Sequence, residues 1–240
     1  YAGAGDYASS ANYSGCIKNS GNLTAGGLLA YGANAPCLEN TGNVTFNCAN
    51  AGNGFFSLKT SAVVCNAGKL YIGAKSPGAS FSDTLIVYAR EAENGIDNSG
   101  ELVCGGLYVD GEYGVTESGI RSDNNFHIKT GIRNTGTGRY DAGSFAQAVS
   151  LCDYAEIKNC LESGIDNVAG TVKVWGNVKI HSNRGNGIQN AAAFAMAGGT
   201  VEKNGTGLSN SGAIRLTGGS ITGNGTGVYQ DGTFFMSGAA

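Results

Sequence analysis

The sequence has little proline, little charge and no long apolar run. Only 2 of its 240 residues are proline and only 14% are charged, well below the usual quarter. A surface with so little charge repels its neighbours weakly and therefore tolerates self-association. The net charge is −3, so the chain lacks the excess of basic residues that binds nucleic acid. No apolar stretch is long enough to cross a membrane. We therefore expect neither a nucleic-acid partner nor a membrane span.

Sequence motifs typical of enzymes and of metal-binding sites are also missing. There is no Cys-x-x-Cys pair of the kind that binds zinc. There is no Gly-x-Ser-x-Gly and no phosphate-binding loop between a strand and a helix. His181 falls at an outward position of an alternating run, which favours a surface residue over a ligand. The sequence therefore predicts that the chain is not an enzyme, and it assigns no catalytic residue, cofactor-binding residue or metal ligand.

Glycine, by contrast, is abundant, with 41 residues. A collagen helix is excluded because no Gly-x-y period exists. Simple disorder is disfavoured because 41% of the residues are apolar and can bury a core. The length is compatible with one elongated domain that covers residues 1–240.

Three copies of one unit, 20 residues apart, open at Gly187, Gly207 and Gly227. Each unit holds short runs of alternating apolar and polar residues, closed by Gly, Asn or Ser, and this pattern predicts strands joined by turns. Three strands per unit leave no room for a helical crossover, so the chain must wind as a coil whose turns stack about 4.8 Å apart. The sequence therefore predicts an all-β fold, a parallel β-helix with three short strands per coil.

In the first two copies a Gly-Gly pair precedes an apolar-x-x-Asn segment, at 198–204 and at 218–224. This pairing is similar to the passenger repeats of chlamydial polymorphic outer-membrane proteins, which are autotransporters. Those repeats favour Phe before x-x-Asn and Ala after Gly-Gly, where this chain has Ile or Val and Thr or Ser. The unit also resembles the right-handed pectate-lyase-type β-helix. The resemblance implies a right-handed coil and an extracellular, cell-surface or cell-envelope setting, and it implies no site residue.

An anchor phrase of apolar-x-Asn, usually followed by a small residue and Gly, recurs along the chain. Its aliphatic residue is expected to point inward, and the Asn two positions later faces the same way because strands have a period of two. Stacked Asn amides can donate to one another and so satisfy buried polar groups. The predicted structural ladder consists of Asn19, Asn40, Asn66, Asn98, Asn134, Asn167, Asn190 and Asn210, and Gln230 closes it. A second ladder is expected at Asn159, Asn183, Asn204 and Asn224.

The middle of the chain is less regular, and we expect an irregular, loop-bearing region at 69–139. The segment Ser76-Pro77-Gly78 predicts a loop there. Loops that project from a rigid stem often carry function. Anchors together with unmarked coils predict about ten coils of roughly 20 residues.

Acidic residues gather in this region and form the best sequence candidate for a site, with Arg121, His127 and Lys129 nearby. Pectin-active β-helix enzymes gather Asp with basic residues on one face, so one interpretation is a cation or sugar patch. We favour the other interpretation, a solvated face that keeps the protein soluble, because the Asn-Thr-Asp and His-Gly of polygalacturonases are missing. The acidic residues are Glu91, Glu93, Asp97, Glu101, Asp110, Glu112, Glu117 and Asp123.

The cysteine count is odd, so at least one thiol has no partner within the chain. Cys16 and Cys37 hold equivalent places one coil apart, within disulfide range, and Cys48 and Cys65 suit neighbouring coils. We expect an oxidising compartment and one thiol that links subunits; reduced thiols in a cytosolic protein are the alternative. The candidates for disulfides are Cys16, Cys37, Cys48, Cys65, Cys104, Cys152 and Cys160.

The leading functional hypothesis is a non-enzymatic extracellular structural protein. It would self-assemble as a homo-oligomer or polymer, by stacking and with intermolecular disulfides, into a cell-surface layer, sheath or filament. The chain does not begin with Met, which predicts a mature or excised chain. Neither end shows the helical period of a cap, which predicts either a fragment of a longer protein or ends that stack on other copies. The alternatives are an adhesin stalk that presents the 69–139 loops to a glycan or host protein, and a pectate-lyase-like enzyme that depends on Arg121 and Asp123.

Overall fold

The computed structural model describes residues 17–26, 28–32, 34–46, 53–73, 84–111, 127–136, 140–141, 144–145 and 148–237. Within these ranges the regular structure consists of strands, and no helix there is long and apolar enough to span a membrane. The strands are β1 (Ile17–Asn19), β2 (Asn22–Ala25), β3 (Leu29–Gly32), β4 (Leu38–Asn40), β5 (Asn43–Phe46), β6 (Asn53–Asn66), β7 (Lys69–Ile72), β8 (Leu85–Asn98), β9 (Glu101–Asp110), β10 (His127–Asn134), β11 (Tyr140–Asp141), β12 (Ser144–Phe145), β13 (Val149–Lys158), β14 (Ser163–Asn167), β15 (Thr171–Val174), β16 (Asn177–His181), β17 (Asn186–Asn190), β18 (Ala193–Glu202), β19 (Thr206–Asn210), β20 (Ala213–Thr222), β21 (Thr226–Gln230) and β22 (Thr233–Met236).

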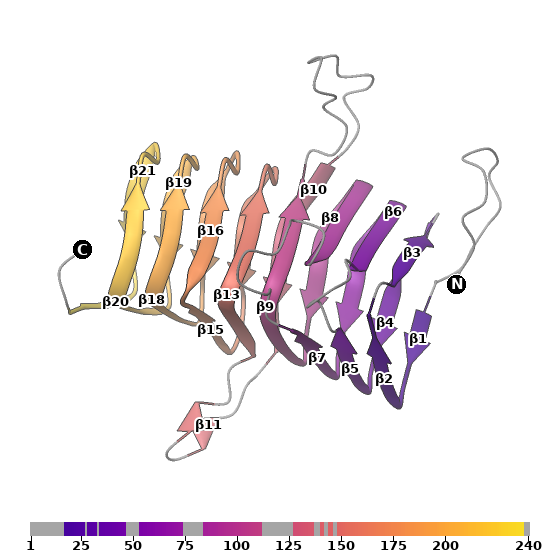
Figure 1. Cartoon of the computed structure of the whole chain (residues 1–240). Helices are drawn as coiled ribbons and strands as arrows, with labels where there is room; N and C mark the ends of the chain where they lie inside the picture. The colour runs from indigo at the N-terminus through magenta and orange to yellow at the C-terminus, as the bar shows by residue number, and fades with distance from the viewer. Residues whose placement is uncertain are drawn as a thin grey trace.

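Parallel pairing arranges all of these strands except β11 and β12 in three faces around one axis (Figure 1). β11 and β12 form a separate antiparallel pair. The first face holds β1, β4, β6, β8, β10, β14, β17, β19 and β21. The second face holds β2, β5, β7, β9, β13, β15, β18, β20 and β22. The third face holds β3, β6, β8, β9, β13, β16, β18 and β20, and long strands occur in two faces because they continue round a corner. The parallel β-helix predicted from the 20-residue period is confirmed.

Coil length varies more than the sequence predicted. From Asn19 to Gln230, successive residues of the ladder are 21, 26, 32, 36, 33, 23, 20 and 20 positions apart. The first face of the described chain holds nine coils, and the expected length of roughly 20 residues fits only those near its two ends. The longest coils overlap the region expected to be irregular, 69–139, and they contain the ranges 74–83, 112–126 and 137–139, which lie outside the described residues. The pairing of β9 with β13 shifts register between Leu151 and Tyr154. The loop expected at Pro77 lies outside the described residues.

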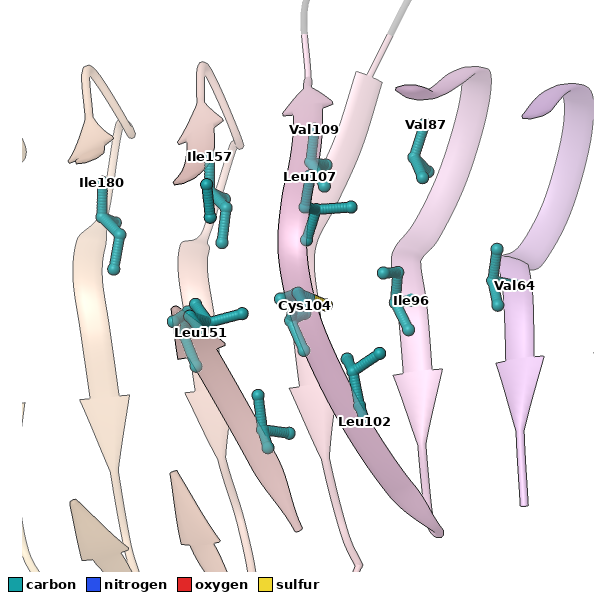
Figure 2. Packing of buried hydrophobic residues seen from close by; sticks show 14 of the residues in the cluster. Val64, Val87, Ile96, Leu102, Cys104, Leu107, Val109, Leu151, Ile157 and Ile180 are labelled. Atoms are coloured by element: carbon teal, nitrogen blue, oxygen red, sulfur yellow. The ribbon is translucent and has the colours of Figure 1, made fainter. Parts of the chain in front are cut away.

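The core consists of apolar side chains stacked in register from coil to coil. On the first face Ile188 pairs with Leu208, and Leu208 pairs with Val228, as the repeat predicts. Figure 2 shows Val64 and Ile96 on the same face, directed into the column. Each fully buried aliphatic side chain stabilises the fold by about 1.5–3 kcal/mol. The residues that precede Ile188 in this stack, one from each earlier coil, are Ile17, Leu38, Val64, Ile96, Ile132 and Ile165.

The anchor asparagines form one continuous hydrogen-bonded ladder inside the column. Each Nδ2 from Asn19 to Asn190 donates to the Oδ1 of the next Asn, over distances between 2.6 and 2.9 Å. Asn210 then donates to the Oε1 of Gln230 over 3.1 Å. From Asn40 to Asn210 these side chains are at most 1% exposed, so the ladder satisfies amides that would otherwise be buried without partners. The ladder runs one way, because every donor faces the following coil.

A second ladder follows the third face, but it is shorter than expected. The Nδ2 of Asn183 donates to the Oδ1 of Asn204 over 2.9 Å, and Asn204 donates in the same way to Asn224 over 3.0 Å. The prediction that Asn159 belongs to this ladder is wrong.

Asn159 lies one residue away from the ladder position. Lys158 pairs with His181, which places Cys160 in the ladder position and Asn159 at the adjoining turn. The φ of Asn159 is 57°, a left-handed conformation that Asn tolerates better than most residues. Its side chain instead donates to the Oδ1 of Asp110 over 2.8 Å. Asn is favoured both at a left-handed turn and in an amide ladder. In this coil the two positions are adjacent, and Asn159 occupies the turn.

Replacing Asn134 by Ala should destabilise the fold. Its Nδ2 donates to Asn167 and to the carbonyl of Ala169, and its Oδ1 accepts from Asn98. The variant leaves these buried groups without a partner, which costs about 1–3 kcal/mol for each group. Urea denaturation should therefore show a lower midpoint. The control is Asn19→Ala in the half-buried first described coil, which should lower the midpoint less; equal shifts would contradict the buried ladder.

Candidate functional site

The described acidic residues of the sequence candidate do not converge on one patch. Glu91, Glu93 and Asp97 lie on β8, whereas Glu101 lies on the second face and Asp110 on the third. Each pairs with a basic residue of an adjacent coil. The pairs of Glu91, Glu93, Asp97 and Glu101 are exposed and contribute only about 0–1 kcal/mol each, whereas the side chains of Asp110 and Lys158 are only 12% and 23% exposed. Glu112, Glu117, Arg121 and Asp123 lie outside the described residues. The pairs are Glu91–Lys59 (3.1 Å), Glu93–Lys129 (2.8 Å), Asp97–Arg133 (3.5 Å), Glu101–Lys69 (3.4 Å) and Asp110–Lys158 (3.6 Å).

The structure gathers a different set of polar side chains on the outer surface of the third face, where β9, β13 and β16 lie side by side. Val109, Ile157 and Ile180 of these strands point into the core (Figure 2). Their neighbours in the sequence therefore face outward, because side chains alternate along a strand. We define the outer polar network as Tyr108, Asp110, Tyr154, Glu156, Lys158 and His181.

Glu156 is one centre of the outer polar network. Its Oε2 accepts from the hydroxyl of Tyr154 over 2.9 Å, and its Oε1 lies 3.0 Å from the Nε2 of His181. The Nδ1 of His181 lies 2.9 Å from the Oγ of Ser182. A carboxylate only accepts, so the tautomer that fits has Nε2–H donating to Glu156 and Nδ1 accepting from Ser182. The Nζ of Lys158 lies 3.6 Å from the same carboxylate.

Asp110 is the second centre. Its Oδ2 accepts from the hydroxyl of Tyr108 over 2.9 Å, and its Oδ1 accepts from Asn159 over 2.8 Å. Lys158 links the two centres, because its Nζ is also 3.6 Å from Asp110 and lies 5.0 Å from the centroid of the Tyr108 ring. The network therefore ties three successive coils together through hydrogen bonds and one shared cation.

The network shifts the pKa values of its own members. The hydrogen bond from His181 lowers the pKa of Glu156 from 4.5 to about 2, and Tyr154 and Lys158 act in the same direction against the effect of burial. Burial raises the pKa of Tyr154 to about 12, and its hydrogen bond to Glu156 adds to the rise. Burial, followed by Asp110, also raises the pKa of Tyr108.

These shifts decide what the network can do chemically. At neutral pH Glu156 is ionised, and Tyr108 and Tyr154 keep their protons, so none of the three has a pKa near the operating pH that general acid–base catalysis favours. The donors and acceptors of the network bind one another, and Tyr108 and Asp110 are only 6% and 9% exposed. The geometry suits the joining of adjacent coils better than proton transfer.

Sequence reasoning placed His181 on the surface but missed the network around it. Tyr108 and Asp110, like Glu156 and Lys158, are separated by one buried residue and align across neighbouring coils. Aligning the third-face strands would have revealed this pattern. That alignment requires the length of each coil. The spacing between Asp110 and Glu156 is irregular, so the coil lengths cannot be read from the sequence.

The described cysteines include no disulfide. Cys37, Cys104 and Cys160 are buried, and Cys65 and Cys152 are partly exposed. Cys16 and Cys48 lie outside the described residues, so the proposed pairings with Cys37 and Cys65 stay predictions. The Sγ of Cys152 donates to the carbonyl of Cys104 over 3.2 Å.

No group of three or more His, Cys, Asp or Glu side chains in the described part of the chain is placed to hold a metal ion. Comparisons with protein-family models, with curated proteins and with solved structures found no match. Inferences about the function of this chain therefore rest on its own residues.

Replacing Glu156 by Gln should reduce the loss of stability in acid. The folded pKa of about 2 lies below the ordinary value of 4.5. The carboxylate therefore stabilises the fold fully above its unfolded pKa, and this contribution is lost as the pH falls from about 4.5 towards about 2. Urea titrations between about pH 6 and pH 3 should show a smaller fall in the free energy of unfolding for the variant than for the wild type.

The matched control for this experiment is Glu162→Gln, at an exposed position outside the network. It should keep the pH dependence of the wild type. Parallel stability profiles for wild type and Glu156→Gln would show that the Glu156 contacts do not stabilise the folded state.

Cys65 should react slowly with alkylating agents near neutral pH. Burial, followed by the charges of Asp97 and Glu39 in the neighbouring coils, raises the pKa of its thiol to about 11, and the thiolate is the reactive form. Labelling with iodoacetamide, read by peptide mass spectrometry, should accelerate about tenfold per pH unit below that pKa. The urea-unfolded chain should label faster at neutral pH, and equal rates for the two states would refute the shift.

Proposed function

We propose that this chain is a non-enzymatic extracellular structural protein whose column forms part of a cell-surface layer, sheath or filament. The observation that carries the proposal is that the described strands form one column, in which the nine first-face strands pair in parallel register from β1 to β21. Stacked repeats of this kind present an extended surface to partners.

The electrostatics of the column are compatible with assembly. Charged residues make up 14% of the chain, and many of those described pair between adjacent coils, as Lys18 does with Glu39 over 2.9 Å. Paired charges leave little net field to hold copies apart. The extracellular setting in this proposal rests on the resemblance of the repeats to autotransporter passengers, and the predicted intermolecular disulfide belongs to the same proposal.

A second candidate is the stalk of an adhesin that binds a glycan or a host protein. It is favoured by the lengthening of the coils to 36 residues between Asn98 and Asn134. A glycan array tests it directly. Binding that disappears when 112–126 is replaced by a short Gly-Ser linker would support the adhesin, and an array without binding would count against it.

The purified chain should assemble in a concentration-dependent way. The low charge of the column repels other copies only weakly, so light scattering should show a mass that rises with protein concentration, and negative-stain electron microscopy should show polymers. A single monomeric mass at every concentration would refute the proposed function.

A further inference from the structure

We propose that the outer surface of the second face binds a linear acidic polysaccharide where β15, β18 and β20 lie side by side. Val174, Met196 and Leu216 of these strands point into the core, so the residues next to them in the sequence face outward. This attachment goes beyond the assembly proposed above, and neither depends on the other. We define the cationic strip as the outward residues Lys173, Trp175, Ala195, Ala197 and Arg215.

The cationic strip carries the opposite sign of charge to the chain as a whole. The net charge of the chain is −3, and elsewhere on the column lysines pair with acidic side chains, as Lys179 does with Glu202 over 2.9 Å. Among the described residues, no ion pair involves Lys173 or Arg215. The segments that cross the second face here, 168–175, 191–199 and 211–219, contain no Asp or Glu. Cations without acidic neighbours attract an anionic partner.

Aromatic rings hold both cations in place. The Nζ of Lys173 lies 5.2 Å from the centroid of the Trp175 ring, and the guanidinium carbon of Arg215 lies 5.5 Å from the centroid of the Phe235 ring. A ring attracts a cation without accepting all of its N–H groups, so donors remain for a carboxylate or a sulfate. Cations that are already positioned lose less side-chain entropy when a partner binds.

Trp175 adds a fixed apolar surface beside Lys173. Its Nε1 donates to the Oγ of Ser150 over 3.3 Å, and Ser150 is only 8% exposed, whereas Trp175 is 44% exposed. The only polar atom of the indole is therefore already bonded, and its exposed part is apolar. The C–H groups on one face of a sugar ring pack well on such a surface. An anionic sugar can thus contact the indole and the Lys173 ammonium together.

The shape of the cationic strip favours a polysaccharide over an acidic peptide. β15, β18 and β20 each pair on both sides, so they offer no free edge to which a peptide strand can add. Lys173, Ala195 and Arg215 are in register on successive strands, which places the two cations on strands about 9.6 Å apart. The methyl group of Ala195 leaves the surface between them shallow. A ribbon-like polymer with anionic groups along its length fits such a surface.

The test measures binding of the full chain to three immobilised probes, namely hyaluronan, dextran sulfate and neutral dextran. The protein is kept below the concentration at which light scattering shows assembly. The wild type should bind an acidic probe and not dextran, and its affinity should fall as the salt concentration rises. Binding of hyaluronan would assign carboxylates to the partner, and binding of dextran sulfate alone would assign sulfates.

Variants of the cationic strip should weaken binding to the acidic probe. Lys173→Gln and Arg215→Gln each remove a charge-assisted contact, and each should lower the affinity about tenfold or more. Trp175→Ala should also lower it, whereas Trp175→Phe, which keeps an aromatic ring, should retain most of the affinity. The matched control is Lys179→Gln, which removes the same charge from the third face and should bind like the wild type.

Thermal unfolding of the Lys173→Gln and Arg215→Gln variants should match the wild type, because both side chains lie on the outer surface. A wild-type chain that binds neither acidic probe would overturn the proposal, as would equal losses of affinity for Lys173→Gln and Lys179→Gln. Polyglutamate that binds as tightly as the acidic probes, together with a Trp175→Ala variant of unchanged affinity, would assign the strip to acidic peptides instead. Light scattering reports assembly separately, and the Lys173→Gln/Arg215→Gln double variant should assemble like the wild type.

Discussion

Hydrogen bonding between buried asparagine side chains holds the coils of this protein in register. Each amide from Asn40 to Asn210 sits among aliphatic side chains and has its partners in the coils before and after it. A coil that slipped by one residue would bury an amide without a partner and turn its aliphatic file towards solvent. The ladder and the apolar files therefore enforce the same register. Coil length is free to vary between 20 and 36 residues because neither depends on what lies between the strands.

The fold was predictable because the residues that repeat along the sequence are the ones that stack on one another in adjacent coils. Ile188 and Leu208 recur 20 positions apart with Asn190 and Asn210 two positions later, and this combination indicates both the coil and its inward face. The lengths of the middle coils were not predictable, because the inserted segments carry no sequence period. Asn159 was misplaced because a left-handed turn and an amide ladder favour the same residue type.

The candidate site was less accessible to sequence reasoning than the fold. Eight acidic residues are close together along the chain, but the five that the structure describes lie on different faces and pair with different basic residues. The outer polar network has the opposite character, because its members are remote in sequence and close in space. Asn159 reaches Asp110 across 49 positions, and Glu156 reaches His181 across 25. Only the pairing of β9 with β13 and of β13 with β16 brings them together.

The direction of the asparagine ladder has an electrical consequence for the whole molecule. Backbone peptide groups alternate in orientation along a strand, so their dipoles largely cancel in a sheet. The ladder amides do not alternate, so their dipoles add along the axis, in surroundings where screening by water is weak. The column consequently carries partial positive charge from amide hydrogens towards β21 and partial negative charge from amide oxygens towards β1, much as an α-helix does through its backbone.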